Sequence, residues 1–290
     1  MHKQSESPIV SFSRDGETLT LGRGPDDPTL HLDGSDGLGL APVSIAKSDR
    51  LAGDGSIVRG VRYGDRDVFI PVLLEAASTG ELSVMRRELT KLLAPHLGEV
   101  EIRVQDPATG TDRMIRGLFR EGLEGTFGTE YRGSWQKVGL VFECNDPWWL
   151  GPEQIVELSL APGVKPFLSD TVPFFPVVLA GSTVQGAFDV VIAGEGQVWP
   201  SWEVVGPGEG LVISNGIEWL EVSGAFPAGS PVLFDTKTRR ITPDRWADMS
   251  TRSRLFPLEQ GPQTITVTLV GATSDSVVRL VYRERYMEGY

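Results

Sequence analysis

The sequence predicts a mainly β protein with one helix, in which an α+β first domain is followed by a β-sandwich second domain. Short alternating or β-branched runs dominate the chain, and 34 Gly and 20 Pro residues separate them. One stretch has its apolar residues at helical spacing. The length of 290 residues suits two domains of roughly 100 to 200 residues each.

The strands predicted in the first half have irregular spacing, which favours a mixed architecture over a pure sandwich. They cover residues 9–13, 18–21, 43–48, 66–74, 98–104, 113–121 and 131–143. Between them, residues 22–42 are rich in Gly, Asp and Pro and are predicted to form a long loop. Loops of that length in compact domains are usually functional or ordered by a partner, although a plain surface excursion is equally compatible.

The predicted helix covers residues 81–97. Ser78 and Glu81 stand three residues apart, as a capping box requires, and Pro95 and Gly98 mark the far end. A helix lying across one face of a sheet is the simplest arrangement that buries its apolar stripe. The stripe, with intervals of three and four, consists of Leu82, Met85, Leu89, Leu92 and Leu93.

The boundary between the domains is predicted at residues 145–152, where a strand ends in the aromatic cluster NDPWWLGP. The expected domains are therefore residues 1–150 and 151–290. After the boundary, β-rich runs return at roughly 8–12-residue spacing, as in a β-sandwich. They cover residues 154–160, 188–192, 201–205, 211–214, 217–222, 231–235, 264–270 and 277–283.

Charge and composition exclude several classes of protein. A formal net charge of -12 opposes specific nucleic-acid binding, which needs Lys and Arg against phosphates. With Cys144 alone, no intramolecular disulfide forms. No apolar run approaches the ~20 residues that cross a bilayer, and the polar start, residues 1–8, lacks the apolar core of a signal peptide.

The search for chemistry yields no catalytic, cofactor-binding or metal-binding residues. His2, His31 and His96 lack metal-ligand spacing, and Cys144 lies in a strand pattern that favours a buried structural thiol. The Asp-rich residues 26–27 and 33–37 could offer oxygens to calcium, but Asp-Gly turns explain them better.

The tryptophans leave an alternative open, because aromatic faces stack on sugars. Trp199 and Trp202 flank Pro200, and Trp219 lies in an alternating strand pattern. Core or interface packing is the favoured role for all three. Carboxylate pairs for glycoside hydrolysis would meet in space and not in sequence, so the sequence does not exclude them.

A series of stretches resembles the distal tail protein family of siphophages, in the version found in phages of actinobacteria. In the first half these are DGSDGLGLAP at 33–42, DG at 54–55, DRDVFIP at 65–71, RELTKLL at 87–93, GEV at 98–100 and LVFECNDPWW at 140–149. In the second half they are FDTKTRR at 234–240 and LFPLEQGPQTI at 255–265. The series spans nearly the whole chain in the family's order, while VWPSW at 198–202 replaces the family's commoner Asn-Pro turn.

The resemblance implies a non-enzymatic structural protein without cofactors, located in the virion at the distal end of the tail and assembled in the host cytoplasm. Its first domain would be tail-tube-like and form a ring, usually of six copies, and its second would be a galectin-like sandwich. The ring would join the tail tube to the tail hub or baseplate, contacting the tail tube protein and the tape measure protein, while DNA passes through the lumen. Residues 22–42 and the hairpin tip at 122–130 are expected to reach a neighbouring subunit.

Two other functions remain open from the sequence. One is a carbohydrate-binding or host-receptor-binding tail component that uses the aromatic residues of the second domain. The other is a polysaccharide-cleaving enzyme, which is disfavoured because a fold does not assign chemistry and no site argues for it.

Overall fold

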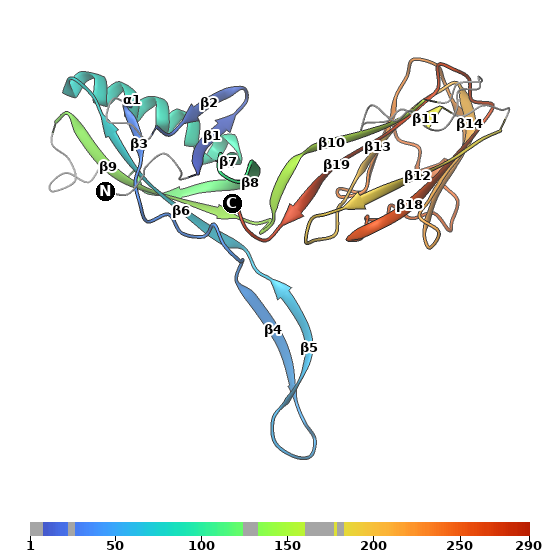
Figure 1. Ribbon diagram of the computed structural model, residues 1–290, viewed down its shortest axis with the longest axis horizontal. Coiled ribbons are helices and arrows are strands. Elements are labelled where there is room, and N and C mark those ends of the chain that lie inside the picture. The colour runs from blue at the N-terminus through green and yellow to red at the C-terminus, as the bar shows by residue number, and fades with distance from the viewer. Residues whose placement is uncertain (1–7, 23–26, 124–132, 160–176, 179–182) are drawn as a thin grey trace. The chain divides into compact units, whose positions relative to one another are not determined.

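The computed structural model describes residues 8–22, 27–123, 133–159, 177–178 and 183–290 (Figure 1). The chain divides into two compact units, one of Met1–Gly151 with Tyr286–Tyr290 and the other of Pro152–Arg285. Residues 286–290 therefore depart from the expected division, which assigned 151–290 to the second domain. The chain is mainly β and its described residues include one α-helix, which confirms the predicted fold class.

The first unit contains a curved antiparallel sheet in the order β3-β6-β9-β8-β7-β1-β2. Strand β8 is long enough to pair with β7 along its first part and with β9 along its last part. β10 (Trp149–Ser159) begins in this unit, where Leu150 pairs with Met114. The other strands are β1 (Ile9–Arg14), β2 (Glu17–Thr20), β3 (Thr29–His31), β6 (Arg66–Glu75), β7 (Val100–Asp106), β8 (Thr111–Glu121) and β9 (Trp135–Cys144).

Helix α1 (Thr79–Leu93) packs its apolar stripe on the core of this unit, as predicted (Figure 1). Leu82, Leu89, Leu92 and Leu93 are buried there, beside the inward side chains of β6. The helix ends before the predicted residue 97 because Pro95, which has no backbone N–H, opens the separate 3-10 turn η2 (Pro95–Leu97).

The N-terminus of α1 has the predicted cap, with one difference. The Ser78 hydroxyl accepts a hydrogen bond from the Glu81 backbone N–H at 3.2 Å. The Glu81 carboxylate reaches back to the N–H of Ala77 at 3.0 Å, one residue before the position that a capping box uses.

The prediction of a loop at residues 22–42 is wrong in part, because the middle of this stretch forms β3, which pairs with β6. Asp36 forms a further bridge with Phe69, and a Cβ at Gly37 would collide with the Asp67 carbonyl oxygen. The described part of this stretch is thus tied to its own unit. Much of the expected hairpin tip at 122–130 lies outside the described residues.

An arm projects from the first unit instead (Figure 1). It consists of β4 (Val43–Asp49), β5 (Ser56–Tyr63) and the turn between them, and none of the other described strands pairs with it. Only β4 was predicted from the sequence. Residues 43–63 are called the arm below.

The second unit consists of two sheets that pack around one core. β11 (Val177–Val178) pairs with β10 in parallel, and η3 (Trp246–Asp248) is a short 3-10 turn. The first sheet contains β17 (Arg240–Thr242), β16 (Val232–Asp235), β13 (Ser201–Val205), β19 (Val277–Tyr286) and β10. The second contains β12 (Thr183–Ile192), β18 (Gly261–Val270), β14 (Gly208–Ser214) and β15 (Trp219–Phe226).

Candidate assembly surface

One face of the arm is mainly apolar and the other mainly polar. Lys47, which pairs with Val58, is the charged residue on the apolar side, and Ile57, which pairs with Ser48, is the apolar residue on the polar side. Ile45 pairs with Val61, and Val43 pairs with Tyr63, so these four side chains share a face. A register shift between Ala46 and Lys47 leaves an extra residue in β5, which brings Val58 to the same face despite its odd spacing from Val61. Ile45, Val58 and Val61 remain 48%, 57% and 62% exposed. These side chains are of the type that usually lies in a hydrophobic core, but here they face solvent.

The root of the arm is held firmly by the first unit. Gly64 N–H donates to the Pro42 carbonyl at 2.7 Å and closes the ribbon. The Tyr63 ring meets Trp148 edge to face with centroids 5.3 Å apart. The Tyr63 hydroxyl also lies 3.7 Å from the Met287 sulfur. The direction in which the arm leaves the unit is therefore fixed by packing.

Arg66, just after the arm, joins two other segments of the first unit to β6. It is 2% exposed, and its guanidinium donates to the carbonyls of Gly37 at 2.9 Å, Gly39 at 2.6 Å and Met287 at 2.9 Å. Burial lowers the pKa of Arg66. The sequence did not identify this residue, because its carbonyl partners are distant in the chain and any residue type can supply them.

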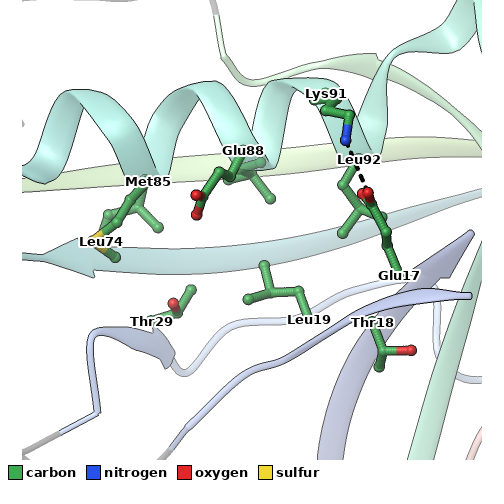
Figure 2. A pocket seen from close by; sticks show the side chains of 10 residues that line it. Glu17, Thr18, Leu19, Thr29, Leu74, Met85, Glu88, Lys91 and Leu92 are labelled. Carbon is green, nitrogen blue, oxygen red and sulfur yellow. Dashed lines mark hydrogen bonds and ion pairs between the residues drawn. The ribbon is translucent and has the colours of Figure 1, made fainter.

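A groove runs between α1 and strands β2 and β3 (Figure 2). Its volume is about 340 Å³, and Leu19, Met85 and Leu92 give it an apolar floor. At one end, Glu17 and Lys91 form an exposed ion pair of 2.8 Å, and this hydrogen bond lowers the pKa of Glu17.

A second hollow shares Met85 with this groove and is lined by Asp27, Glu75, Glu81 and Val84. Together with Glu17 and Glu88 of the first hollow, these side chains give the rim five carboxylates beside the cation of Lys91. The two hollows adjoin at Met85 and are together called the α1 groove below, a partly apolar surface with an acidic rim.

The residues considered for chemistry do not converge on a site. Cys144 is fully buried, as predicted, and burial raises the pKa of its thiol to about 12. The His31 ring contacts the Ser35 hydroxyl at 2.6 Å, and His96 lies in η2. The Asp36 carboxylate accepts from the Gly37 N–H at 2.7 Å, as the turn interpretation requires. In the part of the chain that the structure describes, no three His, Cys, Asp or Glu side chains could hold a metal ion.

The tryptophans of the second unit separate into two groups. Trp202 is 1% exposed and lies in the core, as predicted. Trp219 is 38% exposed and lies outside the core, so of the predicted core or interface packing only an interface role stays a prediction for it; the alternation of β15 buries Leu220 and Val222. Trp246, which the sequence did not single out, is 48% exposed. Across the described ranges, no helix is long and apolar enough to cross a membrane.

Comparison with known proteins shows likeness in structure and none in sequence. No protein-family model and no curated protein matches this chain. The crystal structure of the Dit protein of phage SPP1, a paradigm of the hub adsorption apparatus in phages infecting Gram-positive bacteria, matches 96% of this chain and 99% of its own, with a TM-score of 0.63 and 16% identity.

Two structures of the phage P2 baseplate in its activated conformation match as well. The calcium-bound one covers 94% of this chain and 97% of its own, with a TM-score of 0.56 and 8% identity. The strontium-bound one has the same coverage and TM-score with 9% identity. The resemblance predicted from the sequence is thus confirmed at the level of the fold: this chain has the fold of a phage distal tail protein of the Dit type.

Proposed function

We propose that this chain is a structural subunit of a phage tail tip, which forms a ring in the virion between the tail tube and the tail hub. The ring is expected to contain six copies and to contact the tail tube protein, the hub or baseplate protein and the tape measure protein. The first unit would form the ring and the second, a galectin-like domain, would face outward. The likeness to Dit and baseplate structures over nearly the whole chain supports this role.

The observation that carries the proposal is the apolar face of the arm. An isolated two-stranded hairpin is at best marginally stable in water, and burial of apolar surface is the main source of its stabilisation. The arm leaves Ile45, Val58 and Val61 about half exposed or more. A neighbouring copy of the chain would cover this face and stabilise the arm at the same time.

The α1 groove is the surface that suits the arm best. The arm carries Lys47, Arg50, Arg59 and Arg62 against Asp49 and Asp54, so it is basic in an acidic chain. The groove presents an apolar floor and an acidic rim. Apolar contact would supply affinity, and the opposite charges would fix the register. Because arm and groove are different patches, such contacts run head to tail and can close a ring.

Cysteine cross-linking tests both the ring and the arm contact. Cys144 is buried, so a chain with Val58→Cys on the arm and another with Val84→Cys in the groove each present one reactive thiol. After mixing of differently tagged copies, a short bismaleimide should link the two variants to each other. Ile155→Cys, which is 59% exposed on β10, serves as the matched control in place of Val84→Cys.

The outcomes distinguish the two levels of the proposal. Rings in electron micrographs together with the expected cross-link support both. Rings without the cross-link would retain the structural role but reject the α1 groove as the receptor of the arm. A chain that remains monomeric at high concentration, and that is absent from virions, would reject the structural role itself.

The acidity of the chain has a place in this proposal. Each copy contributes a formal charge of -12. If part of this charge faces the lumen, the wall repels the phosphates of the passing genome, and DNA does not adhere to it.

A further inference from the structure

The second unit contains a cleft of about 310 Å³ that the ring proposal does not use. Indole rings and charged side chains from separate segments line it. Trp199 precedes β13, Glu218 precedes β15 and Arg239 precedes β17, while Trp246 and Arg254 belong to the segment between β17 and β18. The tryptophans and charged side chains of this cleft differ from the lining of the α1 groove, so we expect a ligand of different chemistry to bind here.

The turn that carries Trp246 is anchored to its own unit, although Trp246 is 48% exposed. The neighbouring Arg245 stacks on the ring of buried Phe226 at 4.6 Å and pairs with Asp248 at 2.7 Å. Arg245 also donates to the carbonyls of Ala225 and Ser223. The turn that carries Trp246 is thereby fixed to β15, and Trp246 lines the cleft.

The segment that carries Arg254 is fixed in the same way. Arg254 N–H donates to the Trp219 carbonyl at 2.9 Å, and Ser250 N–H donates to the Glu221 carbonyl at 3.0 Å. The Ser253 hydroxyl donates to the Glu221 carbonyl at 2.6 Å. The backbone around Arg254 therefore follows the edge of β15, while its side chain faces the cleft.

Two arginines, Arg239 and Arg254, line the cleft. Among the residues that the structure describes, neither guanidinium group has a hydrogen-bonding or ionic partner. Arg239 also has a φ of 54°, which an L side chain rarely adopts and which Gly or Asn would occupy at lower cost.

These groups together define the chemistry of a ligand. The indole faces of Trp199 and Trp246 suit the apolar face of a sugar ring. The guanidinium forks of Arg239 and Arg254 suit a carboxylate or phosphate, which they bind through paired hydrogen bonds. Glu218 can accept hydrogen bonds from sugar hydroxyls. We infer that the cleft of the second unit binds a saccharide that carries a carboxylate or a phosphate group.

Titration calorimetry on the full chain tests the inference with three oligosaccharides of similar size: an oligogalacturonate, a phosphorylated oligomannoside and neutral maltotetraose. The acidic sugars should bind and the neutral one should bind at least about tenfold more weakly, because it lacks the group that the arginines pair with. Binding should weaken when salt rises from about 50 to about 500 mM. Which acidic sugar binds decides between the carboxylate and the phosphate. The measurement does not depend on ring formation.

Variants assign the binding to this cleft. Trp246→Ala, Arg239→Gln and Arg254→Gln should each raise the dissociation constant about tenfold or more. The controls are Arg252→Gln and Trp219→Ala, two exposed positions outside the cleft lining, which should bind as the unaltered chain does. Equal binding of the neutral sugar, an absence of binding by both acidic sugars, or full binding by the cleft variants would each overturn the inference. Unchanged thermal melting would show that the exposed cleft substitutions leave the fold intact.

Discussion

Removing the apolar face of the arm should separate assembly from folding. The change is the triple variant Ile45→Thr, Val58→Thr and Val61→Thr, which keeps a β-branched residue at each position and so preserves the strand preference of the arm. None of these side chains contributes to either core. The free energy of unfolding should therefore stay within about 0.5 kcal/mol of the original value, as for other exposed substitutions.

The expected loss of association follows from the exposed fractions. Complete burial of a Val or Ile side chain contributes about 1.5–3 kcal/mol. Since these three residues are 48%, 57% and 62% exposed, about half of that remains to be gained at an interface. This gives about 1 kcal/mol for each side chain and about 3 kcal/mol for the set. The dissociation constant of each contact should therefore be about 100-fold higher in the triple variant.

Sedimentation equilibrium measures the association, and urea denaturation measures the folding. A matched control is the triple variant Ile155→Thr, Val191→Thr and Ile217→Thr, whose side chains are 59%, 61% and 82% exposed on the second unit. The control should associate normally. If both triple variants weaken association equally, or if the arm variant assembles as well as the original chain, the reasoning from the apolar face is refuted.

Three further predictions concern the first unit. Arg66→Ala should lower its free energy of unfolding by about 3 kcal/mol in urea denaturation, because three partly buried carbonyls lose a charged donor; Arg66→Lys should recover part of this. The raised pKa of Cys144 means that the folded state holds its proton more tightly than the unfolded state, so the contribution to stability is complete below pH 9.0 and is lost as the pH rises toward about 12. This alkaline decline should shrink in Cys144→Ala, as measured by urea denaturation across that pH range. Ser78→Ala should lower stability by about 1 kcal/mol through loss of the helix cap, while Ser78→Asp keeps the cap, a difference that thermal melts followed by circular dichroism would detect.

Local patterns predicted the parts of the fold in which one side of an element is buried. The stripe from Leu82 to Leu93 marked the helix, and the alternation of β6 and β9 marked their strands, because each pattern repeats with the period of its own element. Strand β5 was missed for the corresponding reason. It is exposed along almost its whole length, and the extra residue in its register breaks the alternation between Val58 and Val61.

Local sequence patterns could not predict the candidate surfaces, because these surfaces are formed by residues that are distant in sequence. The α1 groove joins Glu17 and Thr29 to the helix, and the cleft of the second unit joins Trp199 to Arg254. The sequence raised the possibility that tryptophans of the second half stack on sugars, but it did not show which indole rings stay exposed. Exposure depends on which strand face meets the core, and a shift of one residue reverses it, as at Trp219.

The charge of the chain strengthens the argument that the arm meets a second copy. Copies with a net charge of -12 repel one another, so association needs local attraction that exceeds this repulsion. The arm supplies four basic side chains against two acidic ones, next to an apolar face that its own unit does not cover. An arm that served only as a solvated spacer would gain nothing from Ile45, Val58 and Val61, which make an exposed ribbon prone to aggregation. Their presence in one row is explained if a partner buries them, and in the proposed contact the acidic rim of the α1 groove would offset the charge of the arm.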